Sequence, residues 1–268
     1  MSTITSQDKN GNTLEFNPYE KKYRYKVNGE VKTGCTSIID PRFGKAGLMG
    51  WAKKLPIEAL KWQMRDDGKP IDEIEAYISK LKTKVDELSI KDATIGTMMH
   101  TLCEDYITGK KPVAPTTEPL KTMFPKFTQW WDNMKIEVIE TEKTYYSEEL
   151  DACGTVDLIC KMNGKLGLID FKTSKSIDYS NYVVQLSAYR KMIMDSTDYK
   201  IEFLGLVNIP KDAGLPINFR KIKVKDDYLQ AFKLCKQLLD FENNYSKQLS
   251  DWKKLINKQR REKQKQKQ

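Results

Sequence analysis

The stretch GTVDLICKMNGKLGLIDFKT, residues 154–173, decides the fold of this chain. Its first part, residues 155–162, is largely β-branched or apolar, and residues 166–171 form a returning apolar run. Asn163-Gly164 between them is a strong signal for a two-residue hairpin turn. The pattern therefore predicts two neighbouring antiparallel strands.

Two carboxylates and a lysine lie inside this hairpin. We expect Asp157 and Asp170 to meet on the neighbouring strands, and alternation places Lys172 on the same face as Asp170. A carboxylate within an apolar strand is costly to bury unless it is paired or binds a metal. Carboxylate oxygens suit Mg2+, and an ammonium group can stabilise developing negative charge or hold a water nucleophile. These residues predict a metal-dependent site that cleaves phosphodiesters, and a structural ion pair on a solvated sheet edge is the alternative.

Four short segments follow one another along residues 95–189: IGTMMH at 95–100, GTVD at 154–157, DFKT at 170–173 and QLSAY at 185–189. In this order they resemble the G-T-x-x-H, G-x-x-D, D-x-K-T and Q-x-x-x-Y elements of the PD-(D/E)XK nuclease superfamily. The resemblance is to its RecB-like exonuclease branch, which includes phage exonucleases and mitochondrial genome-maintenance exonucleases. It implies an α/β (α+β) fold, with a restriction-endonuclease-like mixed β-sheet core flanked by helices.

The resemblance also implies a set of metal ligands. His100 is the single histidine of the chain, and its place in the G-T-x-x-H segment makes it the expected nitrogen ligand. Asp157 and Asp170 are the expected carboxylate ligands, and a main-chain carbonyl at Phe171 would complete the protein's share of the shell. The expected ion is Mg2+, with the histidine tilting the preference toward Mn2+.

Three further residues are expected to take part in catalysis. Lys172 would be an electrophilic or water-orienting cation; nearby carboxylates favour its charged form, burial opposes it, and the sequence does not decide between them. Gln185 and Tyr189 are four residues apart and therefore share a helical face, which the resemblance brings to the metal site. Glu104 and Glu142 are weaker candidates, because the charges around Glu142 fit a solvated strand face equally well.

Composition favours a polyanionic partner and excludes several other classes of protein. Lys and Arg number 46 against 37 Asp and Glu, and part of this excess lies in residues 258–268. The five cysteines form no C-x-x-C pair, which indicates reduced thiols in the cytoplasm of a bacterial or phage-infected cell. Only Cys235 follows Tyr189, so no iron-sulfur cluster is expected. No apolar run approaches the roughly 18 residues of a membrane span, so no membrane partner is expected.

Periodicity along the chain predicts three parts. Residues 1–45 are a small β element and leader, residues 46–257 the nuclease domain with a helical N-terminal insertion, and residues 258–268 a basic low-complexity tail that is frayed or disordered. No helix is expected directly after Gly34. The expected helices cover residues 46–62, 71–88, 93–107, 117–134, 179–194 and 226–258, and the further strands cover 136–146, 201–209 and 218–224. The aromatic residues of 117–134 are expected to pack in the core.

Together these features predict a metal-dependent DNA exonuclease that acts at DNA ends or on single strands. Its setting would be replication, recombination or repair in a phage or bacterium, with a helicase or recombination protein as a partner. A structure-selective endonuclease on the same fold is the first alternative. A nucleic-acid-binding module that has lost its chemistry is the second, and the complete set of acidic and basic site residues argues against it.

Overall fold

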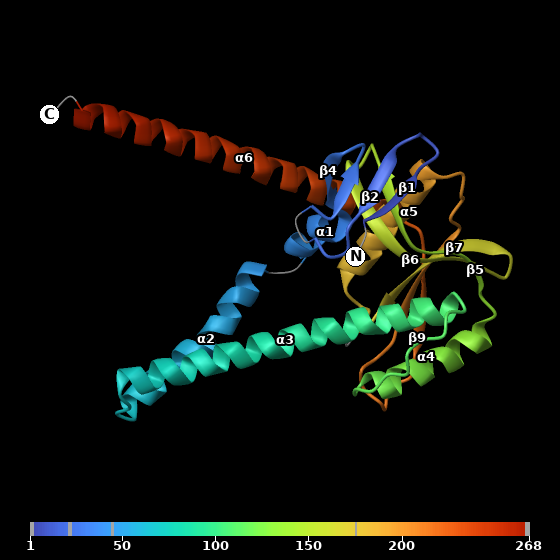
Figure 1. The fold of residues 1–268 in the computed structure, drawn as a ribbon, viewed down its shortest axis with the longest axis horizontal. Helices are drawn as coiled ribbons and strands as arrows, with labels where there is room; N and C mark the ends of the chain where they lie inside the picture. Colours follow the sequence, from blue (N-terminus) through green and yellow to red (C-terminus); the bar gives the residue numbers. More distant parts are fainter. Residues whose placement is uncertain (1–2, 21–22, 44–45, 175, 266–268) are drawn as a thin grey trace.

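A nine-stranded mixed sheet organises the chain, with helices on both of its faces (Figure 1). The computed structural model describes residues 3–20, 23–43, 46–174 and 176–265. The strands are β1 Ile4–Gln7, β2 Thr13–Phe16, β3 Tyr25–Val27, β4 Glu30–Gly34, β5 Glu137–Ser147, β6 Ala152–Met162, β7 Lys165–Lys172, β8 Phe203–Asn208 and β9 Asn218–Ile222. The helices are α1 Cys35–Phe43, α2 Ala46–Asp66, α3 Ile71–Ile107, α4 Leu120–Met134, α5 Ser180–Ser196 and α6 Asp226–Lys265. This architecture confirms the predicted fold class.

The predicted hairpin is present as β6 and β7. The two strands pair antiparallel from Leu158↔Ile169 to Met162↔Lys165. Asn163 and Gly164 have φ values of 52° and 74°, the two positive angles that a type I′ turn requires. The turn residues therefore set the register, and the register brings Asp157 and Asp170 to the same level of the sheet.

Strand β6 has three partners, and this fork creates the site. Strand β5 pairs antiparallel with β6 along its whole length. On the other edge of β6, β4 pairs in parallel with Ala152 and Cys153, whereas β7 pairs with residues 158–162. Residues 154–157 consequently lie where β4 and β7 separate.

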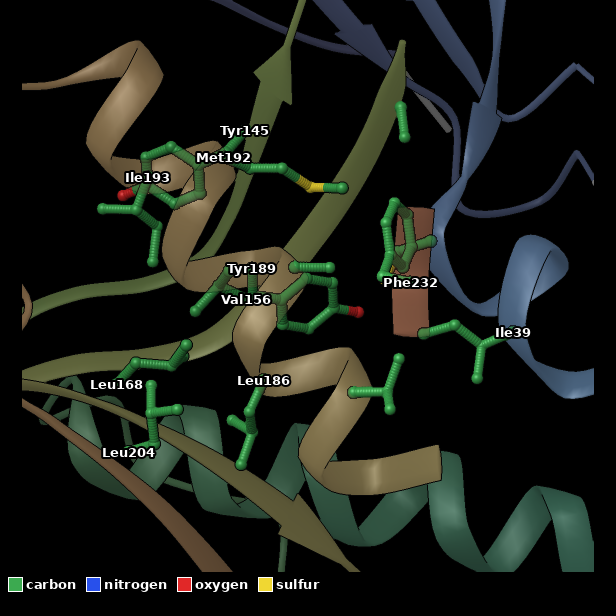
Figure 2. Close-up of a cluster of buried hydrophobic side chains, with 14 of the residues drawn as sticks. Ile39, Tyr145, Val156, Leu168, Leu186, Tyr189, Met192, Ile193, Leu204 and Phe232 are labelled. Carbon is green, nitrogen blue, oxygen red and sulfur yellow. The ribbon is translucent and has the colours of Figure 1, made fainter. Parts of the chain in front are cut away.

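Two hydrophobic clusters cover the two faces of the sheet. On one face α1, α5 and α6 pack against the strands, with Ile39, Leu186 and Phe232 meeting Val156 and Leu168 (Figure 2). The C-terminal part of α3 and helix α4 cover the other face, where helix and strand residues form one cluster: Met99, Cys103, Met123, Phe127, Leu158, Ile169, Phe171 and Val207. The aromatic residues of α4 pack in this second cluster, as predicted.

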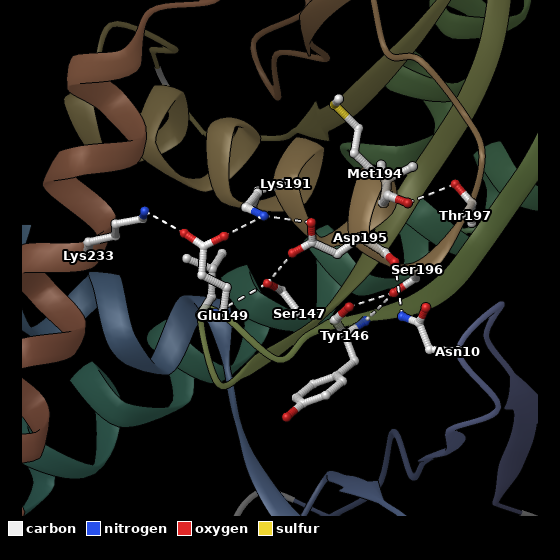
Figure 3. A network of polar contacts seen from close by, with 12 residues as sticks. Asn10, Tyr146, Ser147, Glu149, Lys191, Met194, Asp195, Ser196, Thr197 and Lys233 are labelled. Carbon is white, nitrogen blue, oxygen red and sulfur yellow. Dashed lines mark hydrogen bonds and ion pairs between the residues drawn. The ribbon is translucent and has the colours of Figure 1, made fainter.

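A polar network fastens α5 and α6 to the connection between β5 and β6 (Figure 3). Glu149 in this connection accepts from Lys191 of α5 and Lys233 of α6, with nitrogen–oxygen distances of 2.6 Å for both pairs. Lys191 also contacts Asp195, which accepts a hydrogen bond from Ser147. The pKa of Glu149 is lowered to about 2 by the hydrogen bonds from Lys191 and Lys233.

Several predicted element boundaries were wrong. Helix α3 is continuous over Ile71–Ile107, where two helices were expected, because residues 88–93 contain no glycine or proline to break it. Helix α1 follows β4 directly, although no helix was expected there. Helix α6 runs to Lys265, past the expected end at residue 258, since lysine, glutamine and arginine are good helix formers. Within the described ranges, no helix has the length and hydropathy needed to cross a bilayer.

Candidate active site

Asp157 and Glu142 face each other across the β5–β6 pair at an irregular point. The neighbouring pairs Thr141↔Leu158 and Lys143↔Val156 place Glu142 opposite Asp157. Glu142 has a φ of 46°, in the left-handed region that non-glycine residues adopt infrequently. The regular alternation of side chains between the two faces of β6 is also interrupted here. Val156 and Ile159 pack in the cluster that contains α5, whereas Leu158 packs in the cluster that contains α4. This irregularity turns both carboxylates toward α3.

His100 of α3 completes a cluster with these two carboxylates. One ligand atom from each of His100, Glu142 and Asp157 lies within 4.8 Å of the others. His100 Nδ1 is 3.6 Å from Asp157 Oδ2, which is too long for a hydrogen bond. Met99 is fully buried beneath the helix, and the ring of Phe171 stands edge-on to the imidazole, with the ring centroids 6.3 Å apart. These contacts hold the histidine at the mouth of the site.

Asp170 lies deeper and is crowded by negative charge. It is only 2% exposed, and within the described part of the chain its Oδ2 atom accepts no hydrogen bond. Lys172 Nζ is 2.6 Å from this atom, a charge contact outside hydrogen-bonding geometry. Burial, reinforced by the Asp157 carboxylate, raises the pKa of Asp170 to about 6. The pocket therefore holds more carboxylate than its own cations balance.

Glu142, on the other side of the cluster, is also crowded by negative charge. Its pKa is raised to about 8, first by burial and then by the charges of Asp157, Glu104 and Asp170. Glu104 lies one helical turn after His100 and borders the same cleft. A divalent cation among these carboxylates would relieve their mutual repulsion, and one imidazole with several carboxylates is a donor set that Mg2+ and Mn2+ accept.

Lys172 remains charged in this setting. Burial favours its neutral amine, but the Asp170 and Asp157 carboxylates outweigh burial and raise the pKa of Lys172. The Nζ atom donates a 3.2 Å hydrogen bond to Gln185 Oε1. It also lies 4.9 Å from the centroid of the Tyr182 ring, within the range of a cation–π contact. Three neighbours thus fix the direction of the ammonium group.

The remaining motif residues interlock beside it. Gln185 Nε2 donates a 2.9 Å hydrogen bond to the hydroxyl of Tyr189 and lies 3.5 Å from Asp170 Oδ1. The Tyr189 ring covers Gly154 so closely that a Cβ atom at Gly154 would stand 2.4 Å from a ring carbon. A Cβ atom at Gly96 would likewise lie 3.1 Å from Thr173 Oγ1. Gly96 and Gly154 therefore leave room for Thr173 and Tyr189, which belong to the other two motif segments.

An open cleft of about 490 Å3 gives access to the cluster. His100, Glu142 and Asp157 form one wall, and Arg24 and Tyr25 of the N-terminal β element border the cleft as well. The Tyr25 hydroxyl lies 3.2 Å from Thr155 Oγ1, which connects the β element to β6. The N-terminal strands thus help to shape the candidate site.

The structure brings most of the predicted site residues together in two adjoining groups. His100 and Asp157 lie in the open cluster, and the buried group holds Asp170, Lys172, Gln185 and Tyr189. Phe171 contributes through its backbone amide, which donates a 2.7 Å hydrogen bond to Asp157 Oδ2, while its side chain packs against α4.

Sequence reasoning undervalued Glu142. The run of charges around Glu142 hid it among solvated positions, whereas the pairing register of β5 with β6 sets it opposite Asp157. The position of Glu142 can be identified only by following the β5–β6 pairing from Asp157 to the residue opposite it. Because the register depends on an irregularity between Val138 and Glu140, local pattern alone does not supply it.

Comparison with known proteins gave only distant structural likenesses. No family model matches the chain, and no curated protein matches it. Among solved structures, a protein described as "Putative exonuclease" from Eubacterium rectale aligns with 15% identity and a TM-score of 0.37. The alignment covers 54% of this chain and 64% of the other, so the chain spans less than two thirds of that protein.

Proposed function

We propose that this chain is a divalent-metal-dependent deoxyribonuclease that hydrolyses phosphodiester bonds, working as an exonuclease on DNA ends or single strands. The observation that carries the proposal is the convergence of His100, Glu142 and Asp157 at an open cleft, directly above the buried Asp170–Lys172 pair. A helicase or recombination protein would supply such strands in the cytoplasm of a bacterial or phage-infected cell. The match of four motif segments to the RecB-like branch agrees with this activity.

The proposed ion is Mg2+ or Mn2+. Its protein ligands would be the side chains of His100, Asp157, Glu142 and Asp170 and the main-chain carbonyl of Phe171. Asp170 supports this assignment, because burial and the Asp157 carboxylate raise its pKa to about 6 even though Lys172 Nζ lies 2.6 Å from its Oδ2 atom. When bound there, the cation would polarise the scissile phosphate and activate the attacking water.

The chain's own residues supply the rest of the machinery. Lys172 presents a fixed ammonium group to the negative charge that develops on the phosphate, and preorganised charge of this kind is worth more inside a partly dry site than in water. Gln185 holds Lys172 from one side, and Tyr189 holds Gln185. Arg24 on the cleft wall is placed to bind a backbone phosphate of the strand.

The activity test uses linear and circular single-stranded DNA of the same sequence. Each is incubated with Mg2+, with Mn2+ and with EDTA, using the wild type and the Asp157→Asn and Lys172→Gln variants. Asp105→Asn is the matched control, because Asp105 lies on the same helix as His100 but pairs with the exposed Lys110. We expect release of nucleotides from linear DNA only with metal, with the control active and both site variants inactive.

Other outcomes of this experiment would favour one of the two alternative functions. Cleavage of the circle would favour the structure-selective endonuclease. DNA binding without cleavage in either metal would favour the inactive binding module and overturn the proposal. Calorimetric titration with Mn2+ tests the ion site separately from activity, and His100→Gln should weaken the ion's affinity by about tenfold or more. Unchanged Mn2+ affinity in that variant would remove His100 from the ligand set.

A further inference from the structure

Helix α6 extends away from the sheet (Figure 1). It carries a row of exposed apolar side chains. Their spacing is three or four residues, so they share one side of the helix. We call this row the α6 apolar face; its residues are Leu234, Leu238, Phe241, Tyr245, Leu249, Trp252 and Leu255, between 37% and 65% exposed. A monomer rarely leaves an apolar surface of this length open to water.

The body of the protein uses a different side of α6. Phe232 is fully buried against the sheet layer and Cys235 is nearly so. Glu242 forms an ion pair with Arg42 of α1. The contacts that dock α6 therefore leave the α6 apolar face without a described neighbour, and its length argues for an elongated occupant such as another helix.

We propose that this face pairs antiparallel with the same face of a second copy of the chain. The spacing is nearly symmetric about Tyr245: Phe241 and Leu249 lie four residues to either side, and Leu238 and Trp252 lie seven. A twofold axis through Tyr245 would set Phe241 against Leu249 and Leu238 against Trp252. A surface that is complementary to itself in this way is what an isologous dimer requires.

Charge selects the antiparallel direction. Residues 234–251 hold two lysines against three acidic residues, a net charge of −1. Residues 252–265 hold seven basic residues against Glu262, a net charge of +6. Parallel helices would bring the two strongly basic segments together, whereas antiparallel helices keep them at opposite ends of the pair.

The available area suits a dimer of moderate strength. Phe241, Tyr245 and Trp252 are each more than half exposed, and the first two stack with ring centroids 6.3 Å apart. An aromatic side chain offers roughly 150–250 Å2 when fully buried, so the face with its leucines offers roughly 500–600 Å2 per copy. Two copies would bury on the order of 1,100 Å2, close to the lower limit for a specific interface. Dimerisation should therefore depend on concentration in the micromolar range.

The test is sedimentation velocity of the full chain over roughly 1 to 100 μM, the range in which an interface of this area is expected to associate. The wild type should pass from monomer to dimer, and the Phe241→Gln/Trp252→Gln variant should stay monomeric. Asn243→Gln/Ser250→Gln is the matched control, since both positions are exposed and lie on the side of α6 away from this face. The control should dimerise like the wild type, and circular dichroism should report the same helix content for all three.

Cysteine cross-linking then tests the direction. Tyr245→Cys should form a disulfide-linked dimer on mild oxidation, whereas Leu238→Cys should not, because antiparallel copies hold that position about 21 Å apart. The native cysteines are all buried, so the wild type is the blank. A linked Leu238→Cys dimer would show parallel pairing and overturn the proposal. A wild type that stays monomeric throughout would overturn it too and leave the face to a different partner.

Discussion

Gly154 and Tyr189 show how single residues position the candidate site. Tyr189 is almost fully buried, its ring lies on Gly154, and its hydroxyl holds Gln185, which in turn holds Lys172. The direction of the lysine in β7 therefore depends on the absence of a side chain at Gly154 in the neighbouring strand β6. A glycine and a tyrosine 35 residues apart in sequence act as one unit, so the chemistry that each motif suggests separately is incomplete.

Gly154→Ala should destabilise the protein by about 1–3 kcal/mol, because the added methyl group overlaps a buried ring that has little room to move. Urea unfolding of the metal-free protein measures the effect. Gly214→Ala is the control, since its Cβ atom would meet only the Asp212 side chain at 3.4 Å. Equal stability of the two variants would mean that the Tyr189 ring moves aside without cost.

Tyr182 is the residue that no motif identified. Its ring faces the Lys172 ammonium at 4.9 Å, so it should act as a positioning residue for that group. Tyr182→Leu should lower turnover by about tenfold or more at saturating metal, as expected for loss of a partly desolvated cation–π contact. Tyr182→Phe should retain activity because the ring face remains. The comparison of turnover numbers decides the point, and equal losses in both variants would assign the effect to the hydroxyl instead.

At the scale of elements, locally encoded structure was predictable and the assembly of distant segments was not. The β6–β7 hairpin was predicted because Asn163-Gly164 fixes both its turn and its register. Helix α1 was missed because Gly34 before it and Pro41 within it resemble the punctuation of a loop. The placement of Glu142 depends on a register shift in β5, which no local pattern specifies. Strand β1 likewise gains its hydrogen bonds only by pairing with β2.

The fastening of α5 and α6 by Glu149 leads to a prediction on pH. Because the pKa of Glu149 is lowered to about 2, its contribution to stability is complete above the ordinary carboxyl pKa and is lost as pH falls toward 2. The Glu149 side chain is 51% exposed, so solvent screening limits the contribution to less than about 1 kcal/mol. Glu149→Gln should therefore lower stability slightly at pH 6 and approach the wild type near pH 2. Unfolding curves at both values measure it, and a constant difference would show that charge is not the cause.

At the scale of the whole molecule, the candidate site is assembled from the N-terminal strands, α3 and the central hairpin. Arg24 and Tyr25 reach the cleft although more than 100 residues separate them from Asp157. Sequence reasoning set residues 1–45 apart as a small β element and leader, because nothing local indicates what those strands will pack against. The long helices α2, α3 and α6 then extend away from this centre, which separates the cleft from the basic end of α6 (Figure 1).

This separation predicts that the basic end of α6 affects DNA affinity and leaves catalysis intact. Removing residues 259–268 deletes most of the basic run but none of the α6 apolar face. Each lost phosphate contact should flatten the dependence of log binding constant on log salt by roughly 0.7 for a single strand, so about three lost contacts would lower the slope by about 2. Turnover at saturating DNA should not change, because the cleft and the Lys172 network lie in the body of the protein. Affinity measured across a salt series for both proteins provides the comparison, with Arg24→Gln as a variant altered at the cleft itself. A salt slope that survives the truncation would show that the basic end does not contact the strand, and lost turnover at saturation would show that it reaches the site.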